Sequence, residues 1–219
     1  MSLGQGAKAV ARPPELLPHS GKARGAEANG KDDSDLNLIL SFRAGNEDAF
    51  DRLFVRYQEY VYNVCLGILA NPDDARDCTQ EAFLRVYRKV GEFRGEAAFS
   101  TWLYRVAVNV CVGQLRRRPR HAEASLEDEH VREIADEGPE AWTGPVREAD
   151  EALVREVVAT LPPDYRMVLS LRYFQDLSYE EMIQVLGYTM SQLKVKLHRA
   201  RRAFAKKWVA AGHGALGLG

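Results

Sequence analysis

The chain has 219 residues and a formal net charge of −1, a length that suits one ordinary domain or two small ones. No apolar run approaches the roughly 20 residues needed to span a bilayer, and the N-terminus lacks the apolar stretch of a signal peptide. Composition and charge therefore favour a cytoplasmic protein with no direct membrane insertion.

The near-neutral total conceals a sorting of charge along the chain. Residues 121–151 contain eleven acidic side chains against Arg132 and Arg147. A basic cluster lies just before them, at Arg116, Arg117, Arg118 and Arg120. A block of like charges that also contains prolines and a glycine is typical of a linker rather than of a packed core.

The chain contains no residue pattern that carries catalysis or binds a cofactor. Its five histidines have no metal-ligand spacing, and there is no phosphate-binding glycine-rich loop or nucleophile elbow. Cys65, Cys78 and Cys111 are far apart and form no C-x-x-C pair, so we interpret them as small core residues, with a redox role left open. We expect a protein that is not an enzyme and that has no cofactor and no metal.

The first half of the chain predicts one all-helical domain over residues 34–118. Residues 1–33 are rich in Gly, Ala, Pro and Lys without periodicity, which predicts a disordered N-terminal arm. Helical periodicity then starts at Ser34 and is interrupted at Gly45-Asn46 and at Asn71-Pro72. The next expected elements are a helix over 73–90, a loop over 91–99, and a helix from Thr101 to about Arg117 that Ser100 caps.

The second half predicts another helical domain, over residues 149–209, after an acidic linker at 119–148 and before a flexible tail at 210–219. Helices are expected over 149–161 and 165–174, the second introduced by Pro162-Pro163. Two capping boxes follow around a turn at Gly187, formed by the pairs Ser178 with Glu181 and Thr189 with Gln192. The last two helices are thus a helix-turn-helix. No strand pattern appears, and the fold class is all-α, with two small helical domains joined by a flexible acidic linker.

The last helix has a core side and a free side. Positions three and four apart share a face, which groups Leu193, Leu197, Ala200, Phe204 and Trp208 opposite the free-side residues Ser191, Val195, His198, Arg199 and Arg202. Residues 191–210 contain seven Lys and Arg and no acid, as suits a helix near phosphates in a major groove. A basic, solvated surface helix is the alternative, and the two caps around a short turn argue against it.

Further motifs lie in order along the chain. They are Asp74–Phe83 (DARDCTQEAF), Phe93–Asn109 (FRGEAAFSTWLYRVAVN), and Leu161–Arg166 (LPPDYR) leading into Leu177–Glu181 (LSYEE). With these motifs, residues 35–208 resemble bacterial RNA polymerase sigma factors of the extracytoplasmic-function group. The resemblance implies a region 2 bundle, a region 4 helix-turn-helix, and transcription initiation with core RNA polymerase and promoter DNA as partners. It also implies an anti-sigma protein as a third partner.

The resemblance assigns residues to three sites. The face implied to bind a coiled coil of the largest polymerase subunit holds Asp77, Gln80, Glu81 and Arg85. The part implied to capture and melt the minus 10 element holds Phe93, Arg94, Phe99, Trp102, Arg105, Asn109, Arg116 and Arg117. The face implied to read the minus 35 element holds Ser191, Gln192, Lys194, Val195, His198, Arg199 and Arg202. For Phe99 and Trp102, a place in the core is an equally good interpretation.

The chain departs from the family pattern at the recognition helix. Thr189 stands where Pro is usual, residues 191–196 replace Gly-Thr-Val-Lys-Ser-Arg, and Ile183 stands where a small Ala is usual. The minus 35 specificity therefore cannot be carried over from relatives. Two other functions stay open: a free-standing helix-turn-helix repressor or activator, and a decoy that sequesters a sigma factor's partner.

Overall fold

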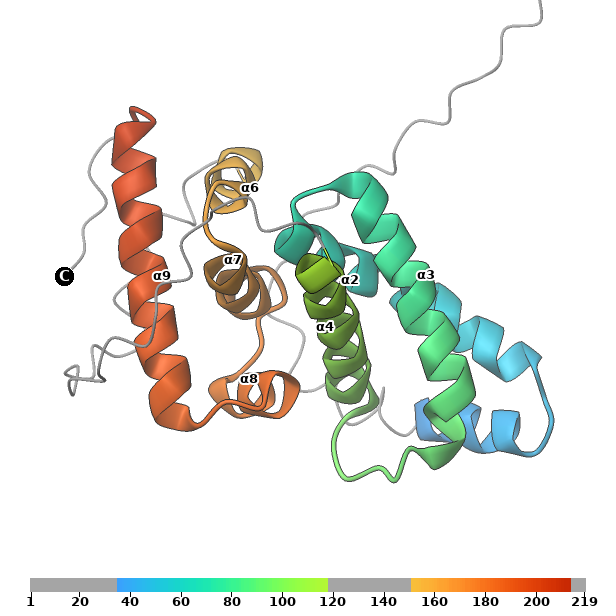
Figure 1. Cartoon of the computed structure of the whole chain (residues 1–219). Helices are drawn as coiled ribbons and strands as arrows, with labels where there is room; N and C mark the ends of the chain where they lie inside the picture. The colour runs from blue at the N-terminus through green and yellow to red at the C-terminus, as the bar shows by residue number, and fades with distance from the viewer. Residues whose placement is uncertain (1–34, 118–150, 214–219) are drawn as a thin grey trace, which may run out of the picture.

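The structure is a computed structural model, which describes residues 35–117 and 151–213. Every regular element in these two ranges is helical, which confirms the all-α prediction (Figure 1). Residues 35–43 form a first helix, followed by α2 (Asp48–Leu69), α3 (Pro72–Lys89), the 3₁₀ turn η1 (Val90–Glu92) and α4 (Phe99–Arg117). The second range holds α6 (Glu151–Ala159), α7 (Pro163–Leu169), the π-helical turn η3 (Ser170–Phe174), α8 (Tyr179–Leu186) and α9 (Met190–Ala210).

The predicted arm at 1–33 and linker at 119–148 lie outside the described residues, so these boundaries remain predictions. The predicted tail is described only up to residue 213. Its first residues pack against α9, because the indole N–H of Trp208 donates to the carbonyl oxygen of His213 at 3.1 Å and the two rings are in contact.

The first helical group is built from α2, α3 and α4, each packed against the other two. The break between α2 and α3 follows from local chemistry. The side chain of Asn71 accepts hydrogen bonds from the backbone N–H groups of Asp73 and Asp74, and Pro72 occupies the first helical position, where its missing N–H costs nothing. The break predicted at Asn71-Pro72 is confirmed.

The start of α4 differs from the prediction. The helix begins at Phe99 rather than at Thr101, so Ser100 lies inside its first turn and does not cap it. The backbone N–H of Trp102 donates to the carbonyl oxygen of Ala98, which adds a helical hydrogen bond before the expected start. Burial of the Phe99 ring accounts for this extension, since only 2% of the residue is exposed.

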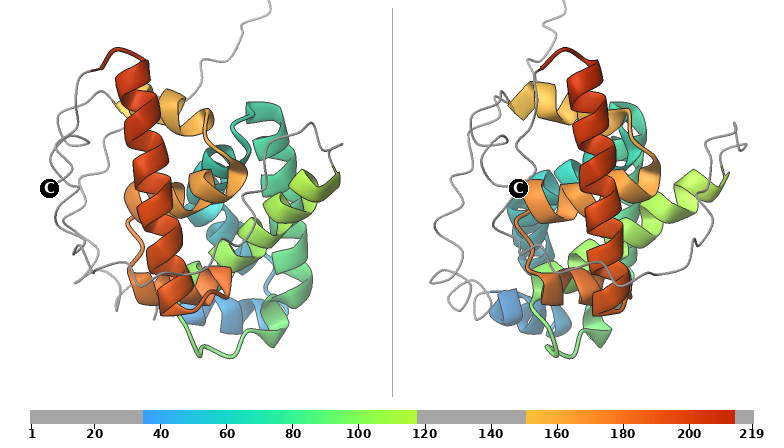
Figure 2. Two further views of the ribbon diagram at one scale, coloured as in Figure 1. Left: turned by 60° about the vertical axis from the view of Figure 1, so that its left-hand side comes forward. Right: turned by 90° about the vertical axis from the view of Figure 1, so that its left-hand side faces the viewer.

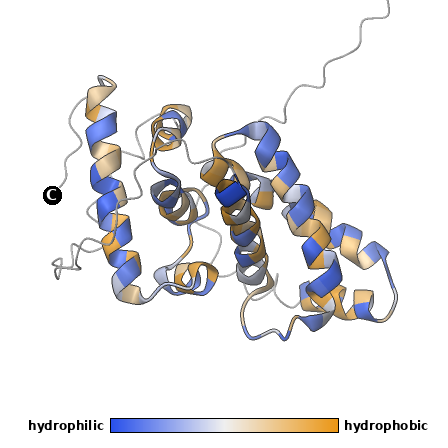
Figure 3. Ribbon diagram, viewed as in Figure 1, coloured by the Kyte–Doolittle hydropathy of each residue, from blue (hydrophilic) through white to orange (hydrophobic). Residues whose placement is uncertain are grey.

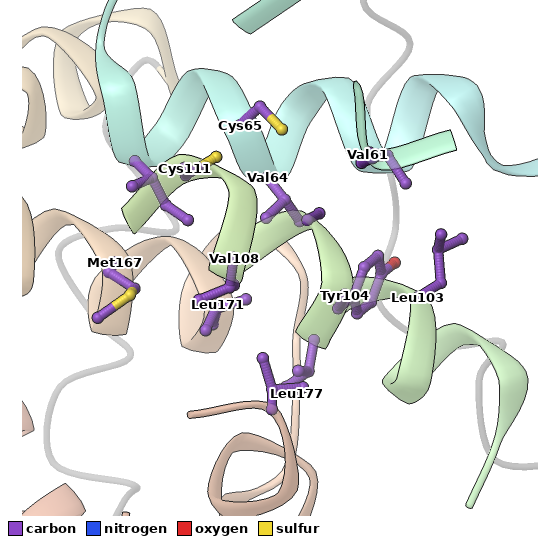
Figure 4. Packing of buried hydrophobic residues seen from close by; sticks show 14 of the residues in the cluster. Val61, Val64, Cys65, Leu103, Tyr104, Val108, Cys111, Met167, Leu171 and Leu177 are labelled. Atoms are coloured by element: carbon purple, nitrogen blue, oxygen red, sulfur yellow. The ribbon is translucent and has the colours of Figure 1, made fainter. Parts of the chain in front are cut away.

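The three cysteines meet in the core of this group, one from each helix. Cys65, Cys78 and Cys111 are all buried and free, so their interpretation as core residues is confirmed. A hydrogen bond from Cys111 lowers the pKa of the Cys65 thiol, and the same bond raises the pKa of Cys111. Burial raises the pKa of Cys78. Figure 4 shows Cys65 and Cys111 among the apolar side chains of α2 and α4.

In the second group the helix expected over 165–174 is two elements. Pro163 at the first helical position starts α7 earlier than predicted, and the chain widens into the π-helical turn η3 from Ser170. Leu193, Leu197, Ala200, Phe204 and Trp208 of α9 are all buried, so the predicted core side of this helix is confirmed. In Figure 3 hydrophilic and hydrophobic residues alternate along the ribbon of α9, as expected for a helix with one buried side.

The two groups share one hydrophobic core. Helices α6, α7 and η3 pack on α2, and α8 packs on α4, as the views in Figures 1 and 2 agree. Val64 of α2 and Val108 of α4 face residues of the second group in Figure 4, namely Met167, Leu171 and Leu177. The sequence predicted two domains on a linker but not this contact between them.

A buried guanidinium holds the contact. Arg166 of α7 is 8% exposed, and its Nε donates to the carbonyl oxygen of Ile68 in α2 at 2.8 Å. Its Nη1 donates to the carbonyl oxygens of Ala159 and Leu161, both at 3.2 Å. Since a buried charge is tolerated only when it is hydrogen-bonded, this side chain ties the end of α2 to the junction of α6 and α7.

Beside this link the two backbones approach closely at Gly67. A Cβ at that position would lie 2.5 Å from the side-chain oxygen of Ser170, so any larger residue would push α2 and η3 apart. The buried Ser170 hydroxyl has no hydrogen-bond partner. The interface therefore combines tight packing with one unsatisfied polar group.

Replacing Arg166 with Met should lower the free energy of unfolding by about 3 kcal/mol, because the apolar stem is kept while buried carbonyl oxygens lose their donor. Urea denaturation followed by circular dichroism measures this. The matched control is Arg76→Ala, whose side chain is 63% exposed and pairs only with exposed Asp73, so it should change stability by less than about 0.5 kcal/mol. Equal effects of the two substitutions would contradict the role of Arg166.

Candidate nucleic-acid and partner interfaces

The polar residues predicted on α3 share one exposed face. Asp77 and Gln80 are exposed, and the Nε of Arg85 donates to Oε1 of Glu81 at 2.7 Å. The opposite face of α3 is buried, through Ala75, Cys78, Ala82, Phe83 and Val86. Since those residues account for the packing of the helix, the polar face is available to a partner.

Two apolar residues of α3 also reach the surface. Leu84 is 54% exposed and lies four positions from Gln80, so an apolar side chain is part of this face. Leu84 was not among the residues predicted for this face, although its spacing from Asp77 and Gln80 places it there. Tyr87 is 44% exposed, and its ring makes edge-on contacts with Phe42 and Phe50.

The aromatic residues predicted for minus 10 binding pack against one another under the loop between η1 and α4. The ring centroid of Phe93 lies 5.6 Å from that of Phe99 and 5.5 Å from that of Trp102. Phe93 and Phe99 are 6% and 2% exposed, whereas Trp102 is half-buried. In this structure Phe93 and Phe99 support the loop, and only Trp102 of the three keeps surface that a base could stack on.

The polar members of the same set face outward. The side chains of Arg94 and Glu96 in the loop are 83% and 79% exposed and 4.0 Å apart. Arg105 and Asn109 are exposed at an i, i+4 spacing on α4, and the exposed pair Arg116 and Arg117 ends that helix. A loop and a helix face with several cations and no packing role suit a nucleic-acid backbone.

Both predicted capping boxes are present in the helix-turn-helix. The side chain of Ser178 accepts from the backbone N–H of Glu181, whose carboxylate accepts from the N–H of Ser178. Thr189 and Gln192 make the same reciprocal pair, at 3.2 and 2.9 Å. Gly187 between the helices has φ +70°, a conformation that favours glycine. Thr189 is therefore the N-cap of α9.

The second box restricts what Gln192 can do. Its Oε1 accepts from the N–H of Thr189, which leaves one lone pair of that oxygen and the Nε2 donors for another contact. A bidentate contact with adenine needs both the oxygen and the nitrogen. The cap therefore fixes the direction in which the Gln192 amide presents these groups.

The cations of α9 divide into two groups. Nζ of Lys196 lies 2.6 Å from Asp164 and 5.3 Å from the centroid of the Tyr188 ring, and Nε of Arg201 donates to the Tyr173 hydroxyl at 2.8 Å. Burial opposes the charge of Lys196, but its hydrogen bond to Asp164 outweighs that effect and raises its pKa. These two residues stabilise the fold. The outward-facing cations are Lys194, Arg202, Lys206 and Lys207, with Arg199 half-buried beside them.

Family models match both groups. Residues 53–121 match Sigma-70 region 2, and residues 151–204 match Sigma-70 region 4. The chain is 35% identical over 182 residues to the RNA polymerase sigma-H factor of Pseudomonas aeruginosa. The matched segment covers 80% of this chain and 93% of that protein. It is 34% identical over 184 residues to the ECF RNA polymerase sigma-E factor of Escherichia coli K12, with 80% and 94% covered.

The chain belongs to the extracytoplasmic-function sigma factors of RNA polymerase. It is thus a transcription initiation factor, and sigma factors are not enzymes in the usual sense. We refer to residues 35–117 as region 2 and residues 151–213 as region 4 from here on.

Two solved structures share the fold. CnrH in complex with the cytosolic domain of CnrY has a TM-score of 0.59 and 20% identity, and covers 81% of this sigma factor and 99% of that chain. The sigma factor RpoE of Bartonella quintana, in complex with the anti-sigma factor NepR, has a TM-score of 0.55 and 20% identity, with 73% and 96% covered.

Within residues 35–117 and 151–213, no helix has the length and apolar character required to cross a membrane. The same part of the chain contains no group of three or more His, Cys, Asp or Glu side chains arranged to hold a metal ion.

Proposed function

We propose that this sigma factor directs core RNA polymerase to specific promoters, with region 2 recognising and melting the minus 10 element and region 4 reading the minus 35 element. The observation that carries the proposal is the separation of faces in both regions: apolar sides are buried together, while the polar face of α3 and the basic face of α9 point outward. Run-off transcription with purified core polymerase on the DNA upstream of the gene tests it. Duplex binding without core-dependent initiation would favour a repressor or activator, and core binding without initiation would favour a decoy.

On α3, Gln80, Glu81 and Leu84 form the proposed polymerase contact. Glu81 is held by Arg85, so its carboxylate is already ordered before a partner arrives. Leu84 offers an apolar anchor among polar neighbours, which is the common composition of a protein interface core within a polar rim.

The compact arrangement cannot read both promoter elements at once. Elements centred about 25 base pairs apart lie roughly 85 Å apart along B-DNA, whereas α2, the longest helix of the shared core, is only about 33 Å long. Residues 118–150, fully extended, would span about 110 Å. We therefore propose that the contact around Arg166 opens when the sigma factor engages polymerase and promoter, and that the acidic linker bridges the distance.

For minus 10, we propose that the exposed loop around Arg94 and the face of Arg105 and Asn109 hold an unstacked base and its backbone. Extruding a base costs a few kcal/mol, which base-edge contacts and nearby cations repay. Trp102, half-buried, supplies the remaining aromatic surface.

We further propose an anti-sigma protein as a regulatory partner. The Bartonella RpoE, which shares this fold, was solved in complex with the anti-sigma factor NepR, and CnrH was solved in complex with the cytosolic domain of CnrY. A protein that binds both regions at once would hold the compact arrangement and prevent the opening described above.

Replacing both Gln80 and Glu81 with Ala should abolish co-purification with core polymerase. Thermal unfolding should stay nearly unchanged, because exposed polar residues usually contribute less than about 0.5 kcal/mol to stability. The matched control is Asp51→Ala with Arg52→Ala, two exposed residues of α2, which should leave polymerase binding intact. Retention of the polymerase by the Gln80/Glu81 variant would refute the assigned face.

Two substitutions in α9 should have different effects on promoter choice. Gln192→Glu keeps an acceptor for the Thr189 cap but removes the amide donor, so it should change preference at one minus 35 position by about 1 to 3 kcal/mol. Arg199→Ala, two turns further along, should weaken all promoters equally and reduce the log-log salt slope by roughly 0.9.

Promoter-selection profiles of the two holoenzymes measure this contrast. Unchanged thermal midpoints would confirm that Gln192→Glu leaves the cap in place. A base-specific change from Arg199→Ala, with none from Gln192→Glu, would show that α9 sits in the groove in a different orientation from the one proposed.

A further inference from the structure

Helical residues 35–43 precede the segment that matches region 2, which starts at residue 53, so the family match gives them no role. They are nevertheless firmly attached to α2. Leu38 and Ile39 are buried in the core, and the wholly buried carboxylate of Asp35 accepts hydrogen bonds from Arg56 and from the Tyr57 hydroxyl. Burial and the bond to Asp35 raise the pKa of Tyr57, so its hydroxyl stays a proton donor at neutral pH.

This helix contacts the loop between η1 and α4 at two points. Nη2 of Arg43 donates to the carbonyl oxygen of Phe93 at 2.5 Å and approaches that of Val90 at 3.4 Å. At the other end of the helix, Leu36 lies beside Gly95. A Cβ atom added to Gly95 would be 3.7 Å from Cδ2 of Leu36. Figures 1 and 2 show the blue helix next to the green loop in every view.

The Arg43 contact lies at the start of the loop, and the Leu36 contact lies at its turn. Leu36 and Arg43 are seven residues apart, roughly 10 Å along the helix. Residues 94–98 form no regular helix, and Gly95 has φ +74°, so the direction of the loop depends on these side contacts. A guanidinium is suited to this role because its planar fork presents several donors in a fixed geometry.

We propose that Arg43 is a positioning residue for the minus 10 loop: by holding the Phe93 and Val90 carbonyl groups, it sets the angle at which residues 94–98 meet an unstacked base. This inference rests on the proposed function of that loop. Arg43 acts on DNA only through the loop, so its loss should affect base capture and leave the polymerase face of α3 unchanged.

The test compares holoenzymes carrying Arg43→Gln, Arg43→Lys and the control Arg52→Gln, an exposed arginine of α2. The probe is a single-stranded oligonucleotide with the minus 10 sequence of a promoter that the wild type transcribes, and a copy with an abasic site at the captured base. The ratio of the two affinities reports base capture. Affinity for core polymerase is measured in parallel.

Arg43→Gln should lower the affinity ratio about five- to tenfold, within the usual range for the loss of one hydrogen bond, with unchanged affinity for core polymerase. Arg43→Lys should give an affinity ratio between those of Arg43→Gln and the wild type. Arg52→Gln should give the wild-type ratio. An unchanged ratio in Arg43→Gln would overturn the proposal, as would an equal loss of polymerase affinity and thermal stability, which indicates a merely structural role. A wild type that does not distinguish base from abasic site would instead refute the proposed function of the loop.

Discussion

The hydrogen bonds of one buried guanidinium decide how the two regions of this sigma factor lie relative to each other. Arg166 needs acceptors because it is buried, and it finds them in region 2 as well as in region 4, at Ile68, Ala159 and Leu161. The helices around it then pack tightly enough that only glycine fits at position 67. Together with the packing of α8 on α4, this contact holds the two regions around the shared core.

The same interface contains reasons why it can open. The Ser170 hydroxyl is buried without a partner, so separation would let water hydrate it, and region 4 keeps the Ala159 and Leu161 acceptors of Arg166 within itself. Each region also has its own apolar faces and its own caps, as at Asn71 and Ser178. The compact form is thus a docked arrangement of two regions that each retain local structure, and an anti-sigma protein that stabilises it would oppose polymerase binding by mass action.

Local chemistry made much of the fold predictable. The break at Asn71-Pro72, the caps at Ser178 and Thr189 and the buried side of α9 follow from residue types a few positions apart, and the structure confirms them. What depends on distant residues was not predictable: the partners of Arg166, the early start of α4 under Phe99, and the contact of Arg43 with the minus 10 loop. For the proposed sites, the sequence grouped residues by helix face but did not show which of them already make contacts within the protein. Gln192 caps its own helix, and Phe93 and Phe99 fill the core beneath the loop.

The measurement that most directly tests this account is the distance between regions 2 and 4 in the free and the transcribing protein. Fluorophores attached through Glu59→Cys in α2 and Ala210→Cys in α9, both exposed positions, would label the two regions while the three native cysteines stay buried. Energy transfer should be efficient in the free protein and fall sharply when core polymerase and a promoter with both elements are added. Transfer that stays equally efficient in a transcribing complex would contradict the account, because the docked regions would then be the active form.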